Sequence, residues 1–337
     1  MTLARPCPAH GTAAPERGFV IGVLMGGGSR ERPISLRSGR AVAAALESCG
    51  HAVRALDVRP GSVTPRLVRG LDVAFLALHG PWGEDGGIQR ELEALGVCYT
   101  GCGPEASRLA MDKIAAKQRF AEAGVPTPAY RLVPPGDAAG LAQCFGAIGP
   151  DLVTKPVADG SSIGVTMCGS AESLRRGARK VWRDGEPVLV ERRIRGREFT
   201  VGILGRTPLP LIEVRVPGGC YSYRYKYFSK RTRYVFDHGL ARPVERRIVD
   251  AALAAFDALG CRDLARVDLM LPPDGRPTVL EVNTIPGFTD HSLVPKAAAR
   301  AGIPFGRLCE RIVGLALERR RSAPAGEPAG AAARARL

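Results

Sequence analysis

The stretch LARVDLMLPPDGRPTVLEVN, residues 264–283, decides the fold class of this chain. It contains two runs in which side chains alternate between opposite faces, and we predict strands over 265–271 and 278–282. Similar strand-like runs alternate with helical patterns along the rest of the chain. This alternation favours α/β layering over an all-α or an all-β fold, so the expected fold class is α/β (α+β).

Charged and amide side chains share one face of each of these two strands. Arg266 and Asp268 lie on one face of the first, and Glu281 and Asn283 on one face of the second. If the strands are antiparallel neighbours, two carboxylates and an amide oxygen converge into a site suited to Mg²⁺ and phosphate. Arg266 would then stabilise charge on a transferring phosphoryl group or an oxyanion. A structural ladder of salt bridges is the alternative interpretation.

The N-terminal part of the chain predicts a strand, a helix and a second strand. We expect strands at 19–25 and 72–78, and a helix at 35–49 that Gly50 closes. The second strand runs into the loop 79–86, and ligands of open α/β sheets collect outside such strand ends. Further along the chain we predict helices at 104–110, 113–123, 244–259 and 305–317, and strands at 152–155, 188–191 and 199–204.

Two glycine-rich segments are candidates for phosphate binding. The first, residues 26–31, follows a strand and precedes a helix, but Glu31 replaces the third glycine of G-x-G-x-x-G. The sequence G-x-x-x-x-G-K-[ST] is also absent, so neither a nicotinamide site nor a P-loop is indicated. The second segment, residues 160–164, follows Lys155. Its backbone N–H groups and that lysine could hold a phosphate, although an ordinary hairpin is equally compatible.

Composition places the chain among soluble globular proteins. It has 337 residues, 45% of them hydrophobic and 24% charged, which suggests two or three structural units. We find no apolar run of roughly 18 residues and no signal-peptide core, and therefore expect a cytoplasmic protein without membrane contact. The nine cysteines form no zinc pattern, so reduced and mostly buried thiols are expected.

The net charge of +15 raises the possibility of nucleic-acid binding. Much of the excess positive charge is arginine in segments typical of solvent-exposed surface, including several arginines between 175 and 183. The sequence also has no RNA-binding or zinc-finger signature. We therefore expect no nucleic-acid partner. The segments 1–17 and 321–337 are predicted to be disordered tails.

Eight blocks in order resemble the D-alanine–D-alanine ligase family over nearly all of residues 19–317. The resemblance implies an ATP-grasp fold of three subdomains. An N-terminal parallel-sheet pre-ATP-grasp domain would span 18–101, followed by a central subdomain at 102–190 and a C-terminal one at 191–320. The blocks are LMGGGSRERPISLRSG, ALHGPWGEDG, MDKIAAK, TKPVADGSSIGV, VLVERRIRGREFTV, YKYFS, ARVDLML and LEVNTIPGFTDHSLVP.

By motif, the resemblance implies that ATP and magnesium (or manganese), with two ions expected, are the cofactors. Lysines would contact the phosphates, and residues 191–198 the adenine and ribose. The residues expected to bind ATP are Lys113, Lys155, Glu191, Ile194, Glu198 and Lys226. Those expected to bind the metal are Asp268, Glu281 and Asn283, while Arg266 and the backbone N–H of Gly287 would form the oxyanion hole.

The resemblance also implies where two D-alanines bind. Glu31 would hold the ammonium of the first, with His79 nearby. Ser292, followed by Leu293, would take the carboxylate of the second.

Catalysis is expected to depend further on Ser161 and Tyr227, which would join Glu31 in a hydrogen-bonded set. The first D-alanine carboxylate would attack the γ phosphate, and the resulting acyl phosphate would accept the second amine. The aromatic and basic segment 218–239 would act as a lid that excludes water.

Two departures from the family pattern bear on the acceptor and on the lid. Pro33 stands where the family often has an acidic residue, and the lid is unusually basic. A related ligase that uses another D-amino or hydroxy acid as acceptor therefore stays the alternative, although Tyr227 favours an amine acceptor. A homodimer is expected by resemblance.

Overall fold

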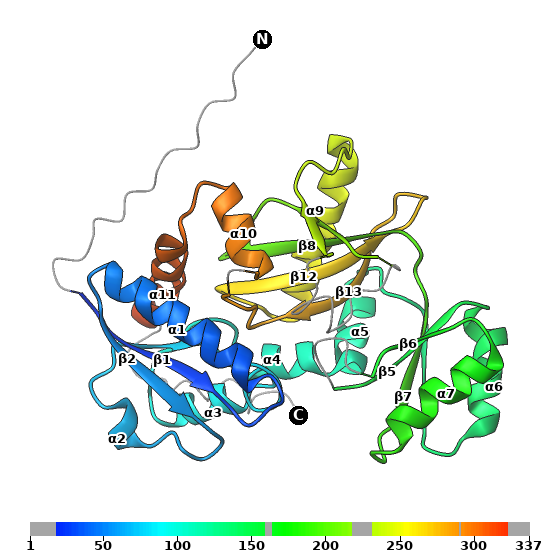
Figure 1. The fold of residues 1–337 in the computed structure, drawn as a ribbon, viewed down its shortest axis with the longest axis horizontal. Coiled ribbons are helices and arrows are strands. Elements are labelled where there is room, and N and C mark those ends of the chain that lie inside the picture. The colour runs from blue at the N-terminus through cyan, green and yellow to red at the C-terminus, as the bar shows by residue number, and fades with distance from the viewer. Residues whose placement is uncertain (1–17, 159–163, 218–230, 290, 323–337) are drawn as a thin grey trace, which may run out of the picture.

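The computed structural model describes residues 18–158, 164–217, 231–289 and 291–322. Three β-sheets succeed one another along this part of the chain (Figure 1). The first is parallel and the other two are antiparallel, so the expected combination of α/β and α+β character is confirmed.

The N-terminal sheet has the strand order β2-β1-β3, and all of its pairs are parallel. Helix α1 begins at Arg32, three residues before its predicted start, and Pro33 lies in its first turn. Proline suits that turn because no N–H is needed there and its φ is already helical. Gly50 follows the helix with φ +88°, as expected for a closing glycine. The elements are β1 (Val20–Gly26), α1 (Arg32–Ser48), β2 (Ala52–Val58), α2 (Pro65–Val68), β3 (Val73–Leu76) and α3 (Gly87–Ala94).

The second sheet has the order β4-β7-β5-β6 and packs against two helices. Helix α7 buries Leu174, Ala178 and Val181 against it and begins with a capping box between Ser170 and Ser173. The elements are α4 (Pro104–Met111), α5 (Lys113–Glu122), β4 (Tyr130–Val133), α6 (Ala138–Ile148), β5 (Leu152–Pro156), β6 (Thr166–Cys168), α7 (Ala171–Trp182) and β7 (Val188–Arg192).

The third sheet has the order β11-β10-β8-β12-β13, with β9 beside β8. Helix α9 packs against β12 and β13. The elements are β8 (Arg197–Leu204), β9 (Thr207–Pro208), β10 (Ile212–Arg215), β11 (Arg233–Val235), α9 (Arg242–Ala258), β12 (Leu264–Leu271), β13 (Thr278–Asn283), α10 (Leu293–Arg300) and α11 (Phe305–Ser322).

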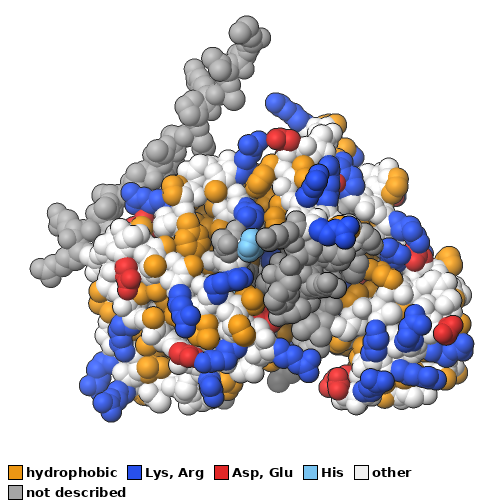
Figure 2. Space-filling view, in the orientation of Figure 1, with side chains coloured by type: hydrophobic (Ala, Val, Ile, Leu, Met, Phe, Trp, Pro, Cys, Tyr) orange, Lys and Arg blue, Asp and Glu red, His pale blue; other side chains and the backbone are white. Residues whose placement is uncertain are grey.

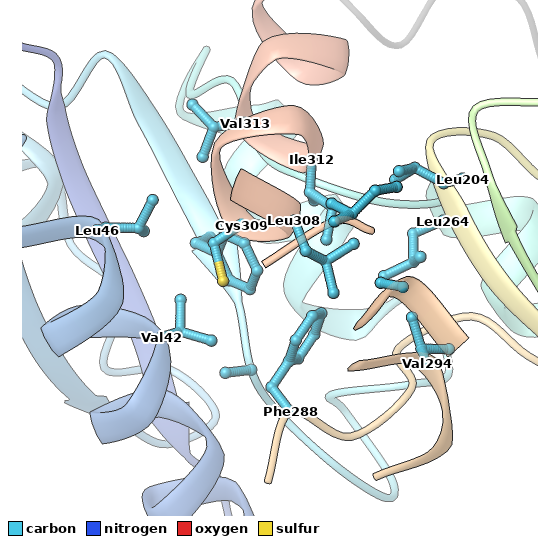
Figure 3. Packing of buried hydrophobic residues seen from close by; sticks show 14 of the residues in the cluster. Val42, Leu46, Leu204, Leu264, Phe288, Val294, Leu308, Cys309, Ile312 and Val313 are labelled. Atoms are coloured by element: carbon cyan, nitrogen blue, oxygen red, sulfur yellow. The ribbon is translucent and has the colours of Figure 1, made fainter. Parts of the chain in front are cut away.

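One hydrophobic core joins the two ends of the described chain. Figure 3 shows Phe288 and Leu308 facing Val42 of α1, and α11 packs against both α1 and β3. The Phe288 ring lies edge-on to that of Phe75, with 5.2 Å between centroids. The last helix therefore folds back onto the first sheet. It ends at Ser322, two residues into the segment predicted as a tail.

Helix α5 lies between the second and third sheets (Figure 1). Its Ala116 and Phe120 belong to the core beneath the third sheet. Lys117, on the same helix, reaches Glu191 of the second sheet. One short helix thus contacts both sheets.

The surface and the thiols of the described residues agree with the expectations from composition. Arg175, Arg176 and Arg179 are exposed on α7, and Figure 2 shows basic side chains spread over the visible face. The seven cysteines within the described ranges are all free thiols. No helix in the described part of the chain is long and apolar enough to cross a membrane.

Candidate active site

The two strands singled out in the sequence are antiparallel neighbours, as the predicted site requires. In the register of β12 and β13, Arg266 lies opposite Asn283 and Asp268 opposite Glu281. Directly opposed side chains share a face of the sheet, with Cβ atoms about 4.5–5.5 Å apart. The register therefore brings the guanidinium, two carboxylates and an amide onto one patch of the sheet.

Asp268 is held from two sides. Arg266 donates from Nε to Oδ1 at 2.9 Å and from its Nη2 to Oδ2 at 2.7 Å. Thr200, which lies opposite on β8, donates its hydroxyl to Oδ1 at 2.6 Å. All three side chains are buried. These three donors fix the orientation of the Asp268 carboxylate, and carboxylate oxygens are ligands that suit a hard cation.

Glu281 and Asn283 complete the oxygen donors of this face. The Asn283 Oδ1 accepts the Ile285 N–H at 2.9 Å, which fixes the amide and leaves its second lone pair. Across the described ranges, no group of three or more His, Cys, Asp or Glu side chains is placed to hold a metal. The donor set here has two carboxylates and one amide, which is the hard-oxygen chemistry that Mg²⁺ prefers.

The segment after β13 brings Gly287 next to Ser292. A Cβ on Gly287 would lie 2.8 Å from Ser292 Oγ, so only glycine allows this approach. Ser292 is the N-cap of α10, and its Oγ accepts the Thr289 N–H at 2.9 Å. The Thr289 hydroxyl lies 2.9 Å from the same oxygen. Both main-chain and side-chain groups of Thr289 therefore orient the Ser292 hydroxyl.

The loops that follow β1 and β3 meet at one edge of the N-terminal sheet. Ser29 donates its hydroxyl to the His79 carbonyl at 2.8 Å and accepts the Glu31 N–H at 3.2 Å. Glu31 and His79 are 6% and 5% exposed. The Nδ1 of His79 lies 3.9 Å from Glu84, while its buried Nε2 has no hydrogen-bond partner among the described residues.

The expected nucleotide-binding lysines gather at the second sheet. Lys113, at the start of α5, donates from Nζ to the Val157 carbonyl just after β5 at 3.3 Å. Lys155 Nζ lies 2.7 Å from Glu191 Oε2, and Lys117 Nζ lies 3.0 Å from Glu191 Oε1. Burial acts to raise the pKa of Glu191, but the charges of these two lysines outweigh it and lower the pKa.

The other expected nucleotide residues lie on or before β8. Ile194 and Glu198 are both half-buried, and Glu198 pairs with Met270 of β12 in the sheet. Three expected residues, Ser161, Lys226 and Tyr227, fall outside the described residues, as does most of the expected lid.

Three buried residues at these sites were missed by sequence reasoning. Thr200 alternates with Glu198 along β8 and so shares the face of Asp268, a signal that strand alternation could have supplied. Lys117 falls on the helical stripe of Ala116 and Phe120, where a lysine is unusual. No local sequence pattern predicts the contact of Thr289 with Ser292, because its hydrogen bonds depend on the conformation of a loop.

Comparison with known proteins adds independent findings. Residues 120–314 match the model of the D-ala D-ala ligase C-terminus, and residues 59–102 match that of the D-ala D-ala ligase N-terminus. The D-alanine–D-alanine ligase of Desulforudis audaxviator is 48% identical over 303 residues, which are 89% of this chain and 99% of that protein.

Two solved structures are similar over most of their length. The D-alanine–D-alanine ligase from Bacillus anthracis complexed with ATP has a TM-score of 0.78 and 32% identity, covering 91% of this chain and 99% of that one. The VanG D-Ala:D-Ser ligase from Enterococcus faecalis also has a TM-score of 0.78, with 27% identity, covering 89% and 100%. The fold is therefore that of an ATP-grasp ligase.

The sequence relatives narrow this class further. With 48% identity to a protein that it covers almost completely, the chain belongs to the D-alanine–D-alanine ligase family.

Proposed function

We propose that this chain joins two D-alanines into D-alanyl-D-alanine, a precursor of peptidoglycan, and converts ATP to ADP and phosphate. The observation that carries the proposal is the register of β12 and β13, which opposes Asp268 to Glu281 and Arg266 to Asn283. A sheet that needed only stability would not gather these groups on one face with Arg266 and Asp268 buried, since buried charge is costly.

Asp268, Glu281 and Asn283 would hold Mg²⁺ or Mn²⁺, with two ions as our proposal. Their oxygens fit a hard cation, and internal hydrogen bonds fix the Asp268 carboxylate and the Asn283 amide in place. When bound, the metal would neutralise phosphate charge. Arg266, fixed by both carboxylate oxygens of Asp268, presents its cation to the same region without reorganisation.

The nucleotide is proposed to lie between the second and third sheets. Lys113 and Lys155 bind its α and β phosphates, Lys226 its γ phosphate, and Ile194 and Glu198 its adenosine, together with Glu191. A solved relative of 32% identity is complexed with ATP, which supports this part of the proposal.

The two D-alanines would lie near the glycine-containing loops. Glu31 binds the ammonium of the first, and the buried Nε2 of His79 is a polar group left for substrate. The first carboxylate attacks the γ phosphate and forms an acyl phosphate. The second amine then displaces phosphate, with the Gly287 N–H stabilising the oxyanion and Ser292, before Leu293, binding the second carboxylate.

We also propose the hydrogen-bonded set of Glu31, Ser161 and Tyr227, and a division into units at 18–101, 102–190 and 191–320. A homodimer and a cytoplasmic location complete the proposal. The alternative acceptor stays open, because a D-Ala:D-Ser ligase has the same TM-score as the ATP complex.

The decisive experiment supplies ATP, Mg²⁺ and D-alanine and measures ADP release together with the dipeptide. We expect D-alanine to stimulate ADP release and D-alanyl-D-alanine to accumulate. D-serine and D-lactate, each offered with D-alanine, test the alternative acceptor. Absence of D-alanine-stimulated ADP release would overturn the proposed function.

A matched pair of variants locates the chemistry. Glu281→Gln removes the negative charge of a proposed metal ligand and should abolish ADP release. Asp274→Asn changes an exposed carboxylate at the far end of the same hairpin and should leave it unchanged.

A further inference from the structure

Lys117 is a buried cation that the proposed reaction does not use. Its side chain is 2% exposed, although lysine is almost never fully buried unless it is paired. Its ammonium donates to the Thr127 hydroxyl at 2.9 Å and the Pro128 carbonyl at 3.0 Å, and it pairs with Glu191 at 3.0 Å. Two hydrogen bonds and one ion pair therefore hold the ammonium in place.

Glu191 is shared between Lys117 and Lys155. Lys117 lies by Oε1, and Lys155 lies 2.7 Å from Oε2. The two lysines differ in access: the side chain of Lys155 is 12% exposed, whereas that of Lys117 is 2% exposed. Lys155 is the last residue but one of β5 and its side chain is partly exposed, while Lys117 is enclosed by Thr127, Pro128 and Glu191.

This arrangement matters when phosphate binds to Lys155. A lysine that turns from a buried carboxylate to a phosphate leaves that carboxylate uncompensated, which is strongly unfavourable. A second cation that stays in place removes this penalty. We propose that Lys117 is a positioning residue of the nucleotide site, which keeps Glu191 charged and fixed and so releases Lys155 to bind the phosphates of ATP.

This inference rests on the proposed function for the role of Lys155. Lys155 is assigned to phosphates that are not transferred, so weaker binding there affects the ground state and the transition state alike. The Michaelis constant for ATP should change, while the turnover number and the Michaelis constants for D-alanine should not.

The first test is Lys117→Met, which keeps an unbranched side chain one atom shorter than lysine and removes the charge. We expect the Michaelis constant for ATP to rise about 10- to 30-fold, in line with the loss of a charged hydrogen bond, and the turnover number to stay within about threefold. Lys180→Met, an exposed lysine on α7, is the control and should match the unaltered chain.

A double-mutant cycle separates this role from simple packing. If Lys117 acts through Glu191, neutralising both should cost less than the sum of the single changes, so Lys117→Met should have little effect on ATP affinity in a Glu191→Gln background. Additive effects in the cycle would overturn the inference. So would an ATP constant within twofold of the unaltered chain, or parallel losses in turnover and D-alanine affinity.

The unaltered chain offers a readout that needs no variant. Burial, followed by the charge of Lys155, lowers the pKa of Lys117 to about 8, against the opposing effect of Glu191. The Tyr130 ring also faces it, 5.0 Å from the ammonium. Lys117 is charged below pH 8, so the Michaelis constant for ATP should rise between about pH 7 and pH 9. A flat profile in this range would contradict the inference.

Direct ATP binding, measured by calorimetry without D-alanine, distinguishes a failure of the proposed function from a failure of the proposed role of Lys117. If the unaltered chain makes no dipeptide, the proposed function fails. The effect of Lys117→Met on ATP affinity still decides the role of Lys117 in that case.

Discussion

Thr200→Val should weaken magnesium binding without disturbing the fold. Valine has nearly the shape of threonine and removes only the hydroxyl that donates to Asp268 Oδ1 at 2.6 Å. Thr200 is 2% exposed, so water cannot replace the lost donor. Asp268 keeps its two hydrogen bonds from Arg266 but loses the contact that fixes it from the side of β8.

The expected loss of Mg²⁺ affinity follows from the type of hydrogen bond that Thr200→Val removes. A hydrogen bond to a charged group contributes about 1.5–3 kcal/mol. Because Arg266 still donates two hydrogen bonds to Asp268, we expect a loss in the lower part of this range, about 1.5–2 kcal/mol. Since about 1.4 kcal/mol is a factor of ten, this corresponds to roughly 12- to 30-fold in an equilibrium constant. Loss of a partner that orients a metal ligand typically costs about 10- to 100-fold in metal affinity, which includes this range.

The assay measures D-alanine-stimulated ADP release while free Mg²⁺ is titrated at a fixed concentration of the magnesium–ATP complex. The half-saturating Mg²⁺ concentration should rise about 10- to 30-fold in Thr200→Val. Thr200→Ser keeps the hydroxyl and should behave as the unaltered chain. If both variants bind Mg²⁺ equally well and fold equally well, Asp268 is not a metal ligand and the reasoning is refuted.

Three further predictions test the substrate loop, a buried carboxylate and the shared core. Gly287→Ala places a Cβ 2.8 Å from Ser292 Oγ, so the Michaelis constant for the second D-alanine should rise at least tenfold while ATP binding stays unchanged. The same Michaelis constant in the variant and in the unaltered chain would contradict the proposed acceptor site. Hydrogen bonds from two arginines, opposed by burial, lower the pKa of Glu213 to about 2 from 4.5, so its contribution is complete above pH 4.5 and disappears as the pH falls to 2. Allowing for the partial exposure of both arginines, Glu213→Gln should cost about 2 kcal/mol in urea unfolding at pH 7, and the difference from the unaltered chain should shrink towards pH 2. Phe288→Ala, at 2% exposure, should cost about 3–5 kcal/mol by the same measurement, and a cost below about 1 kcal/mol would show that this core does not join the two ends of the chain.

The sequence predicted the arrangement of the candidate metal-binding residues where regular structure determines it. Strand alternation placed Arg266 with Asp268, and Glu281 with Asn283, on one face of each strand. The antiparallel pairing that brings the two faces together was a condition of that prediction, and the structure confirms it. The resemblance added the loop residues Glu31 and Ser292. Both lie in the described structure beside other expected residues, although their roles stay predictions.

Other features could not be predicted because they depend on tertiary contacts. Strand β2 was missed, since its exposed and half-buried residues on an edge strand lack a clear apolar run. The pairing of Lys117 with Glu191 joins a helix to a strand 74 residues later in the chain, which no local pattern encodes. The return of α11 onto α1 likewise depends on the complete core.

The two expected D-alanine sites are joined by a single helix. Glu31 is the N-cap residue of α1, and Ser38, about two turns further along the same helix, accepts the Phe288 N–H at 3.3 Å. Phe288 lies between Gly287 and the Ser292 loop, and its ring is anchored against the N-terminal sheet. The group proposed to bind the first ammonium and the loop proposed to bind the second carboxylate are therefore both in contact with one helix. In the proposed reaction an amine must reach an acyl carbon within about 3–3.5 Å, which requires such fixed spacing, so α1 would contribute to catalysis without its own helical residues touching substrate.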